Sequence, residues 1–89
     1  MARMDVGSAD VSGFASSLDS GEAYFELGLM YAAGRQVELD LVAAHKWLNV
    51  AVFKGCFEAA ARRAELAAEM SADEVKAALR EARLFLTLH

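Results

Sequence analysis

The residues able to carry catalysis or to bind a metal are few and widely spaced in this chain. It contains one cysteine, Cys56, and two histidines, His45 and His89. Zinc sites use ligands at short recurring intervals, such as paired cysteines or the HExxH motif, and the sequence contains neither pattern. A lone histidine on a helix is most often a surface or half-buried residue. We therefore predict no catalytic residue, no metal site and no bound cofactor.

The common nucleophile and phosphate-binding motifs are missing as well. No serine stands in a GxSxG elbow or an SxxK pair, and the six glycines are scattered along the chain. Cys56 lies between Gly55 and Phe57, where it is most simply a small apolar packing residue. Only Lys54 stands close enough in sequence to activate its thiol. The sequence thus indicates a protein that is not an enzyme.

Length and composition favour one small domain with an apolar surface. The 89 residues are 56% hydrophobic, and the larger apolar residues outnumber what a few short helices can bury. We expect an exposed apolar patch that contacts a partner or a second copy. Thirteen acidic and nine basic residues give a net charge of −4, with no basic stripe, which argues against nucleic-acid binding. No apolar run reaches membrane-spanning length and no signal sequence follows Met1, so a cytoplasmic location is expected.

The elements that must position any functional residues are helices, and the first firm one is predicted over residues 20–33. Asp19 as N-cap and Glu22 three residues later form a capping box at its start. Gly28 falls where a side chain would push a neighbouring helix away. Gly34 is predicted to end the helix in the left-handed conformation that glycine adopts without steric cost. One face is predicted to point inward: Ala23, Leu27 and Tyr31.

A second helix is predicted over residues 41–54, capped by Asp40 and ended by Gly55. Its inward face is predicted to hold Ala44, Trp47 and Ala51. Trp47 is interpreted as a core residue of the helix pair, packed across from Tyr31, and not as a binding hot spot.

Two further helices are predicted, over residues 57–69 and 72–87. In the first we expect a narrow packing stripe of Phe57, Ala60, Ala61, Ala64 and Ala68, with a Glu58–Arg62 pair on the solvated side. Ser71 and Glu74 form a capping box at the start of the second. Its packing face is predicted to be Val75, Leu79, Ala82 and Leu86.

The stretch 23–55 resembles one Sel1-like repeat. The resemblance rests on Ala23, Leu27, Gly28, Tyr31, Gly34, Val37, Asp40, Ala44, Lys46, Trp47, Ala51 and Gly55. It departs at Gln36, where the family usually has a second loop glycine. The resemblance implies a tetratricopeptide-like helical hairpin used for protein binding. Residues 57–89 are interpreted as a degenerate capping hairpin, which makes the fold all-α, a short α-solenoid of about four main helices.

Residues 19–89 are thus predicted as one Sel1-like domain, preceded by a flexible or marginally helical arm over 1–18. The best candidates for contact with a protein partner are apolar or charged residues away from the packing stripes: Phe25, Glu26, Leu29, Phe53 and Phe85. The leading hypothesis is a small non-enzymatic adaptor that binds another protein in its groove or on its apolar flank. A structural homodimer with no other binding surface is the alternative. A third hypothesis places a ligand or catalytic site around His45 at a subunit interface.

Overall fold

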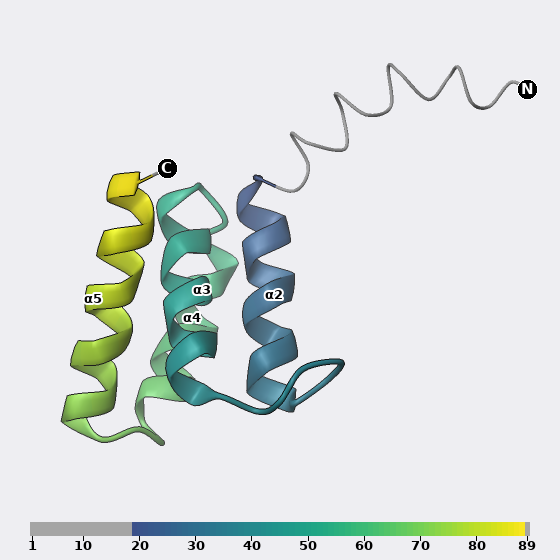
Figure 1. Ribbon diagram of the computed structural model, residues 1–89. Coiled ribbons are helices and arrows are strands. Elements are labelled where there is room, and N and C mark those ends of the chain that lie inside the picture. Colours follow the sequence, from purple (N-terminus) through teal and green to yellow (C-terminus); the bar gives the residue numbers. More distant parts are fainter. Residues whose placement is uncertain (1–18, 89) are drawn as a thin grey trace, which may run out of the picture.

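The described part of the computed structural model, residues 19–88, forms four α-helices and no strand. They are α2 (Gly21–Ala33), α3 (Leu41–Phe53), α4 (Glu58–Ala67) and α5 (Ala72–Leu88), joined by short connections (Figure 1). The predicted all-α class is confirmed, and the helix bounds agree with the sequence to within a few residues. The arm predicted over residues 1–18 lies outside these residues, as does His89.

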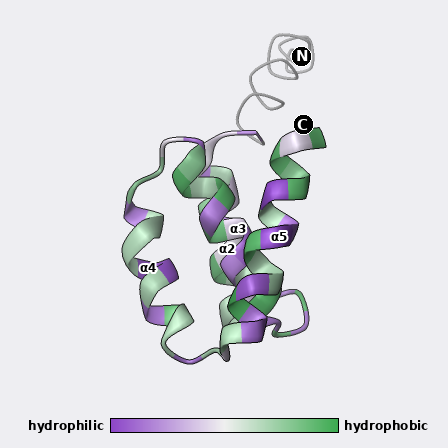
Figure 2. Ribbon diagram, turned by 90° about the vertical axis from the view of Figure 1, so that its left-hand side faces the viewer, coloured by the Kyte–Doolittle hydropathy of each residue, from purple (hydrophilic) through white to green (hydrophobic). Residues whose placement is uncertain are grey.

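Helix α3 is the centre of the molecule, because α2, α4 and α5 each pack against it. In Figure 1, α2 and α5 flank α3 and α4 lies behind it. Helices α2 and α3 form the predicted antiparallel hairpin. Helices α4 and α5 are not one of the principal packing pairs, and Figure 2 shows them standing apart, joined at one end. The second half of the chain therefore does not repeat the close pairing of the first.

The helix ends largely follow the predicted capping residues. Gly34 ends α2 with φ 67°, and its N–H donates to the Met30 carbonyl. The carboxylate of Asp40 accepts from the Ala43 N–H at 3.0 Å. Ser71 and Glu74 make the reciprocal bonds of the capping box, at 3.1 and 2.8 Å.

The start of α2 differs from the prediction, because Ser20 and not Asp19 is the N-cap. The Ser20 hydroxyl accepts from the Ala23 N–H at 3.1 Å. Asp19 stands one residue earlier, where its carboxylate instead accepts from the Tyr24 hydroxyl and pairs with Lys54. The capping box with Glu22 is therefore absent from this end of α2.

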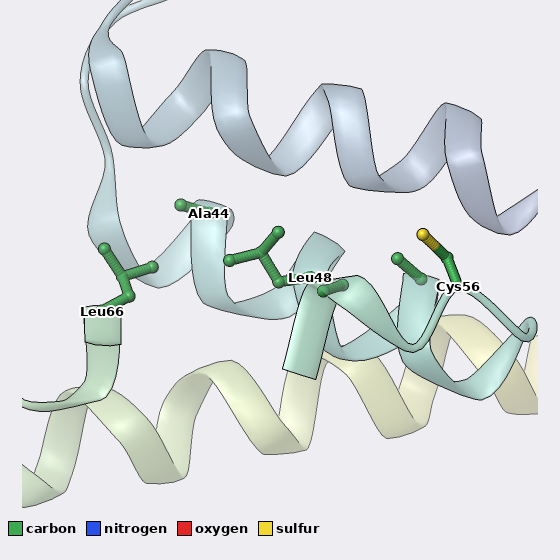
Figure 3. Close-up of a cluster of buried hydrophobic side chains, with 6 residues drawn as sticks. Ala44, Leu48, Cys56 and Leu66 are labelled. Carbon is green, nitrogen blue, oxygen red and sulfur yellow. The ribbon is translucent and has the colours of Figure 1, made fainter. Parts of the chain in front are cut away.

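The core lies where α2, α3 and α4 meet. The buried cluster consists of Ala44, Leu48, Ala51, Cys56, Ala59 and Leu66 (Figure 3). Gly28 has no room for a side chain, since a Cβ atom would lie 2.7 Å from Cδ2 of Leu48 and 3.2 Å from the Ala44 carbonyl oxygen. The predicted close approach at Gly28 is confirmed. Gly21 is equally tight against Cys56, a contact the sequence did not indicate.

The packing faces of α2 and α4 differ from the predicted ones. Four half-buried side chains of α2 pack on the cluster, namely Tyr24, Phe25, Tyr31 and Ala32, so of the predicted stripe only Tyr31 takes part. In α4 the buried residues are Ala59 and Leu66, whereas four members of the predicted stripe are exposed: Phe57, Ala61, Ala64 and Ala68. Arg62 pairs with Glu65 and not with Glu58. Alanine is the most frequent residue of α4, so the apolar pattern alone did not determine which side of this helix faces α3.

Candidate functional site

An apolar groove runs between α3 and α5. It encloses about 460 Å³ and is lined by Asn49, Phe53, Leu79, Arg83, Leu86 and Thr87. We call it the α3/α5 groove. The Phe53 side chain is 74% exposed at its edge, and Leu79 is 37% exposed. None of the six lining residues is acidic.

The groove stays open because of how α5 meets α3. The residues of α5 that are fully buried are Ala78 and Ala82. Leu79 and Leu86, which the sequence placed on the packing face, lie to one side and line the groove. Helix α4 does not close the space, since its main contact is with α3. Arg63 of α4 contacts one lining residue of the groove, since its guanidinium donates to the side-chain oxygen of Asn49.

A second groove lies between α2 and α4 on the other side of α3. It encloses about 210 Å³ and is lined by Leu29, Ala32, Leu41, Leu48, Arg62, Glu65, Leu66 and Glu69. We call it the α2/α4 groove. Its floor is apolar, but charged residues of α4 form its rim, with Arg62 and Glu65 3.5 Å apart. It is therefore smaller and more polar than the α3/α5 groove.

Three aromatic rings from α2, α3 and α5 meet on one flank. Trp47 stacks on Tyr24 with ring centroids 5.6 Å apart, and Phe85 lies edge-on to both rings. The Lys46 ammonium lies 4.3 Å from the Trp47 ring centroid. The predicted partner of Trp47 was Tyr31, and the structure corrects this to Tyr24 and Phe85. The reason is the position of α5, which brings Phe85 against the open side of the hairpin.

A polar link ties the start of α2 to the end of α3. The Tyr24 hydroxyl donates to Asp19 at 2.8 Å, and the Lys54 ammonium lies 3.4 Å from the same carboxylate. Burial, the hydrogen bond to Asp19 and the charge of that carboxylate raise the pKa of Tyr24 to about 12. The phenol acts as a structural donor to Asp19.

His45 is buried, in contrast to the surface or half-buried position expected from the sequence. It is 3% exposed, and its Nδ1 atom has no hydrogen-bond partner among residues 19–88. Burial and the nearby positive charge of Arg63 lower the pKa of His45, although a backbone hydrogen bond opposes the shift. His45 is not among the lining residues of either groove. Its neutral form is the one that suits this site.

The sequence-predicted contact residues do not gather at one place. Phe25 is half-buried against the core, Glu26 is exposed on α2, and Leu29 lines the α2/α4 groove. Phe53 lines the α3/α5 groove, and Phe85 belongs to the aromatic cluster.

Sequence reasoning missed Arg83 and placed Leu79 and Leu86 inside. The only sequence signal for them was the seven-residue spacing of the two leucines on α5.

Between residues 19 and 88 no three histidine, cysteine or acidic side chains are grouped to hold a metal ion. None of the helices there is both long and apolar enough to cross a membrane. Comparison with known protein families, curated proteins and solved structures finds no match to this chain. Its function is therefore argued from its own residues.

Proposed function

We propose that this protein is a small non-enzymatic protein-binding module of the Sel1-like repeat type. The observation that supports this most is the exposure of Phe53 at the edge of the α3/α5 groove. A phenylalanine that is 74% exposed contributes little to the packing of its own chain. Beside an apolar groove it can contribute strongly to binding, because large apolar residues near pockets form interface anchors.

The composition of the groove suits a protein segment better than a small polar ligand. Leucine and phenylalanine side chains provide apolar contact, while Asn49 and Arg83 provide a few polar groups that can fix the orientation of a bound chain. A short amphipathic helix or an extended segment would bury the exposed face of Phe53 together with Leu79 and Leu86. The α2/α4 groove, which Leu29 of the predicted contact residues lines, offers less apolar surface.

Crosslinking tests this proposal at a single position. A photoreactive phenylalanine analogue would replace Phe53 in one sample and Phe57 in a second. Phe57 is the matched control, because it is 75% exposed but does not line the α3/α5 groove. We expect a crosslinked partner from native lysate with the probe at Phe53, and loss of that partner from an affinity pull-down when Phe53→Glu replaces the wild type. Equal crosslinking from both positions would contradict the proposal.

The same samples distinguish the alternatives. If the probe at Phe53 crosslinks only to a second copy, and light scattering gives twice the monomer mass, the structural homodimer replaces the adaptor. A ligand or catalytic site at His45 predicts that His45→Ala abolishes partner capture or a cellular phenotype. The adaptor hypothesis predicts that partner capture by that variant falls only as far as its stability does.

A further inference from the structure

We infer that the α3/α5 groove binds a helical protein segment that carries acidic side chains beside its apolar anchors. The inference rests on the proposed function and adds the chemistry of the partner. Arg83 is the one charged residue that lines the groove, among apolar and neutral polar neighbours. An apolar groove with a basic rim selects partners that place carboxylates at its edges and keeps basic segments away.

Helix α5 carries a row of basic residues that ends at Arg83 in the groove. Lys76, Arg80 and Arg83 follow one another at i, i+4 and i+7, so they share one face of the helix, and all three are exposed. Asp73, in the first turn, is the acidic residue at matching spacing. Glu81 lies on another face, where it lines a separate hollow with Lys46 and Leu84. Figure 2 shows hydrophilic and hydrophobic residues alternating along this helix.

A fourth positive charge lies next to the groove. Arg63 is half-buried and donates to Asn49, which lines the groove floor. Its charge adds to burial in lowering the pKa of His45, which lies on α3 as Asn49 does. Because a half-buried charge is less screened than one in open solvent, Arg63 raises the potential of the groove floor.

The dimensions of the groove fit about two turns of a helix. Leu79 and Leu86 are seven residues apart on α5, which corresponds to about 10 Å along the helix axis. A partner helix with apolar residues at i, i+4 and i+7 covers the same length and leaves its flanks for carboxylates. The α2/α4 groove differs in charge, because Glu65 and Glu69 line it together with Arg62, which pairs with Glu65.

Fluorescence anisotropy with the full chain and three synthetic helical peptides tests the inference. All three peptides are 16-mers with leucines at i, i+4 and i+7; the flanks carry glutamate in one, glutamine in the second and lysine in the third. We expect the glutamate peptide to bind about tenfold more tightly than the lysine peptide at about 0.05 M salt, with a smaller difference at about 0.5 M. In a variant that combines Arg80→Glu with Arg83→Glu, the lysine peptide should bind more tightly than the glutamate peptide. Arg35→Glu, in the exposed loop after α2, is the control that should leave the order unchanged.

Phe53→Glu locates the binding and separates the two proposals. If glutamate and lysine peptides bind equally and Phe53→Glu abolishes both, the charge inference is wrong and the proposed function stands. If neither Phe53→Glu nor Phe57→Glu changes the affinity for the peptides, the peptides bind elsewhere. The charge inference and the proposed function are then both wrong. The inference of an acidic partner is also wrong if no peptide binds. It is wrong as well if light scattering shows a dimer, in which a second copy of the chain occupies the groove.

Discussion

Helix α3 meets α2 through small residues and meets α5 beside an open groove. On the α2 side, Ala44 and Ala51 are fully buried, and Gly28 lies so close to Leu48 that no further atom fits. On the α5 side, Ala78 and Ala82 are also fully buried, but Phe53 remains exposed at the edge of the α3/α5 groove. One helix thus carries a closed interface and an open one.

The difference shows how a small chain can be stable and still present apolar surface. Close contact between alanine and glycine faces stabilises the helix pairs without large side chains. The larger side chain of Phe53 is then not needed for the core. Changes on the closed side should therefore alter stability, and changes on the open side should alter binding.

Leu48 and Phe53 give the largest contrast between the two sides. Leu48 is 1% exposed in the core, so Leu48→Ala should lower the free energy of unfolding by about 2–5 kcal/mol. Phe53→Ala should change it by no more than about 0.5 kcal/mol. Urea unfolding followed by circular dichroism measures both values. Similar losses for the two variants would mean that the α3/α5 groove is closed in solution.

Gly28→Ala tests how tightly the closed side is packed. Its Cβ would lie 2.7 Å from Leu48 and 3.2 Å from a backbone oxygen, so we expect a loss of about 1–3 kcal/mol despite the better helix propensity of alanine. Thermal and urea unfolding measure the loss. Leu48→Ala in the same chain should reduce it, because the clashing atoms are removed. A stabilised Gly28→Ala variant would show that α2 and α3 can separate at no cost.

Gln36→Gly tests the turn that brings the closed side together. Gln36 is the non-glycine residue with positive φ in the described chain, at 69°. The left-handed conformation costs a side-chain-bearing residue about 1–2 kcal/mol, and the added freedom of glycine in the unfolded chain offsets part of this. We expect a gain of about 0.5–1 kcal/mol in the free energy of unfolding. Gly34→Ala, at φ 67°, should act in the opposite direction.

The pH dependence of the free energy of unfolding reports on His45, a buried residue of α3. Its pKa is lower in the folded protein than in the unfolded chain, through burial and the charge of Arg63, so the unfolded state binds the proton more readily. The contribution of neutral His45 to the free energy of unfolding is therefore complete above the unfolded pKa of about 6.5. It is lost as the pH falls below that value. Urea unfolding between pH 7 and pH 5, compared with His45→Leu, measures the difference. Parallel curves for the two proteins would show that His45 titrates as it does in the unfolded chain.

The sequence predicted the local features of the fold well and the contacts between helices poorly. Caps such as Asp40 and Ser71, and the glycine at position 28, depend on a few neighbouring residues, so their types are informative. The packing faces of α4 and α5 depend on where each helix docks. An alanine side chain is so small that its burial does not determine which face of a helix turns inward, and Ala64, expected inside, is exposed. Leu79 was also expected inside, but it lines the α3/α5 groove.

The candidate site was only partly predictable for the same reason. Phe53 was identified because it stood off the expected packing stripe of its helix. The groove beside it arises from two helices that both pack on α3 and diverge from each other, and no local pattern encodes that divergence. Arg83 and Thr87 join the site through this arrangement alone.

The dependence of α2, α4 and α5 on α3 has a consequence for local opening. Since α4 and α5 each depend on α3 more than on each other, either can detach while the rest of the chain stays assembled. Amide protons of α3 should therefore exchange last, at the rate of global unfolding, and those of α4 and α5 earlier and independently. An occupant of the α3/α5 groove would slow exchange in α5 and leave α4 unchanged.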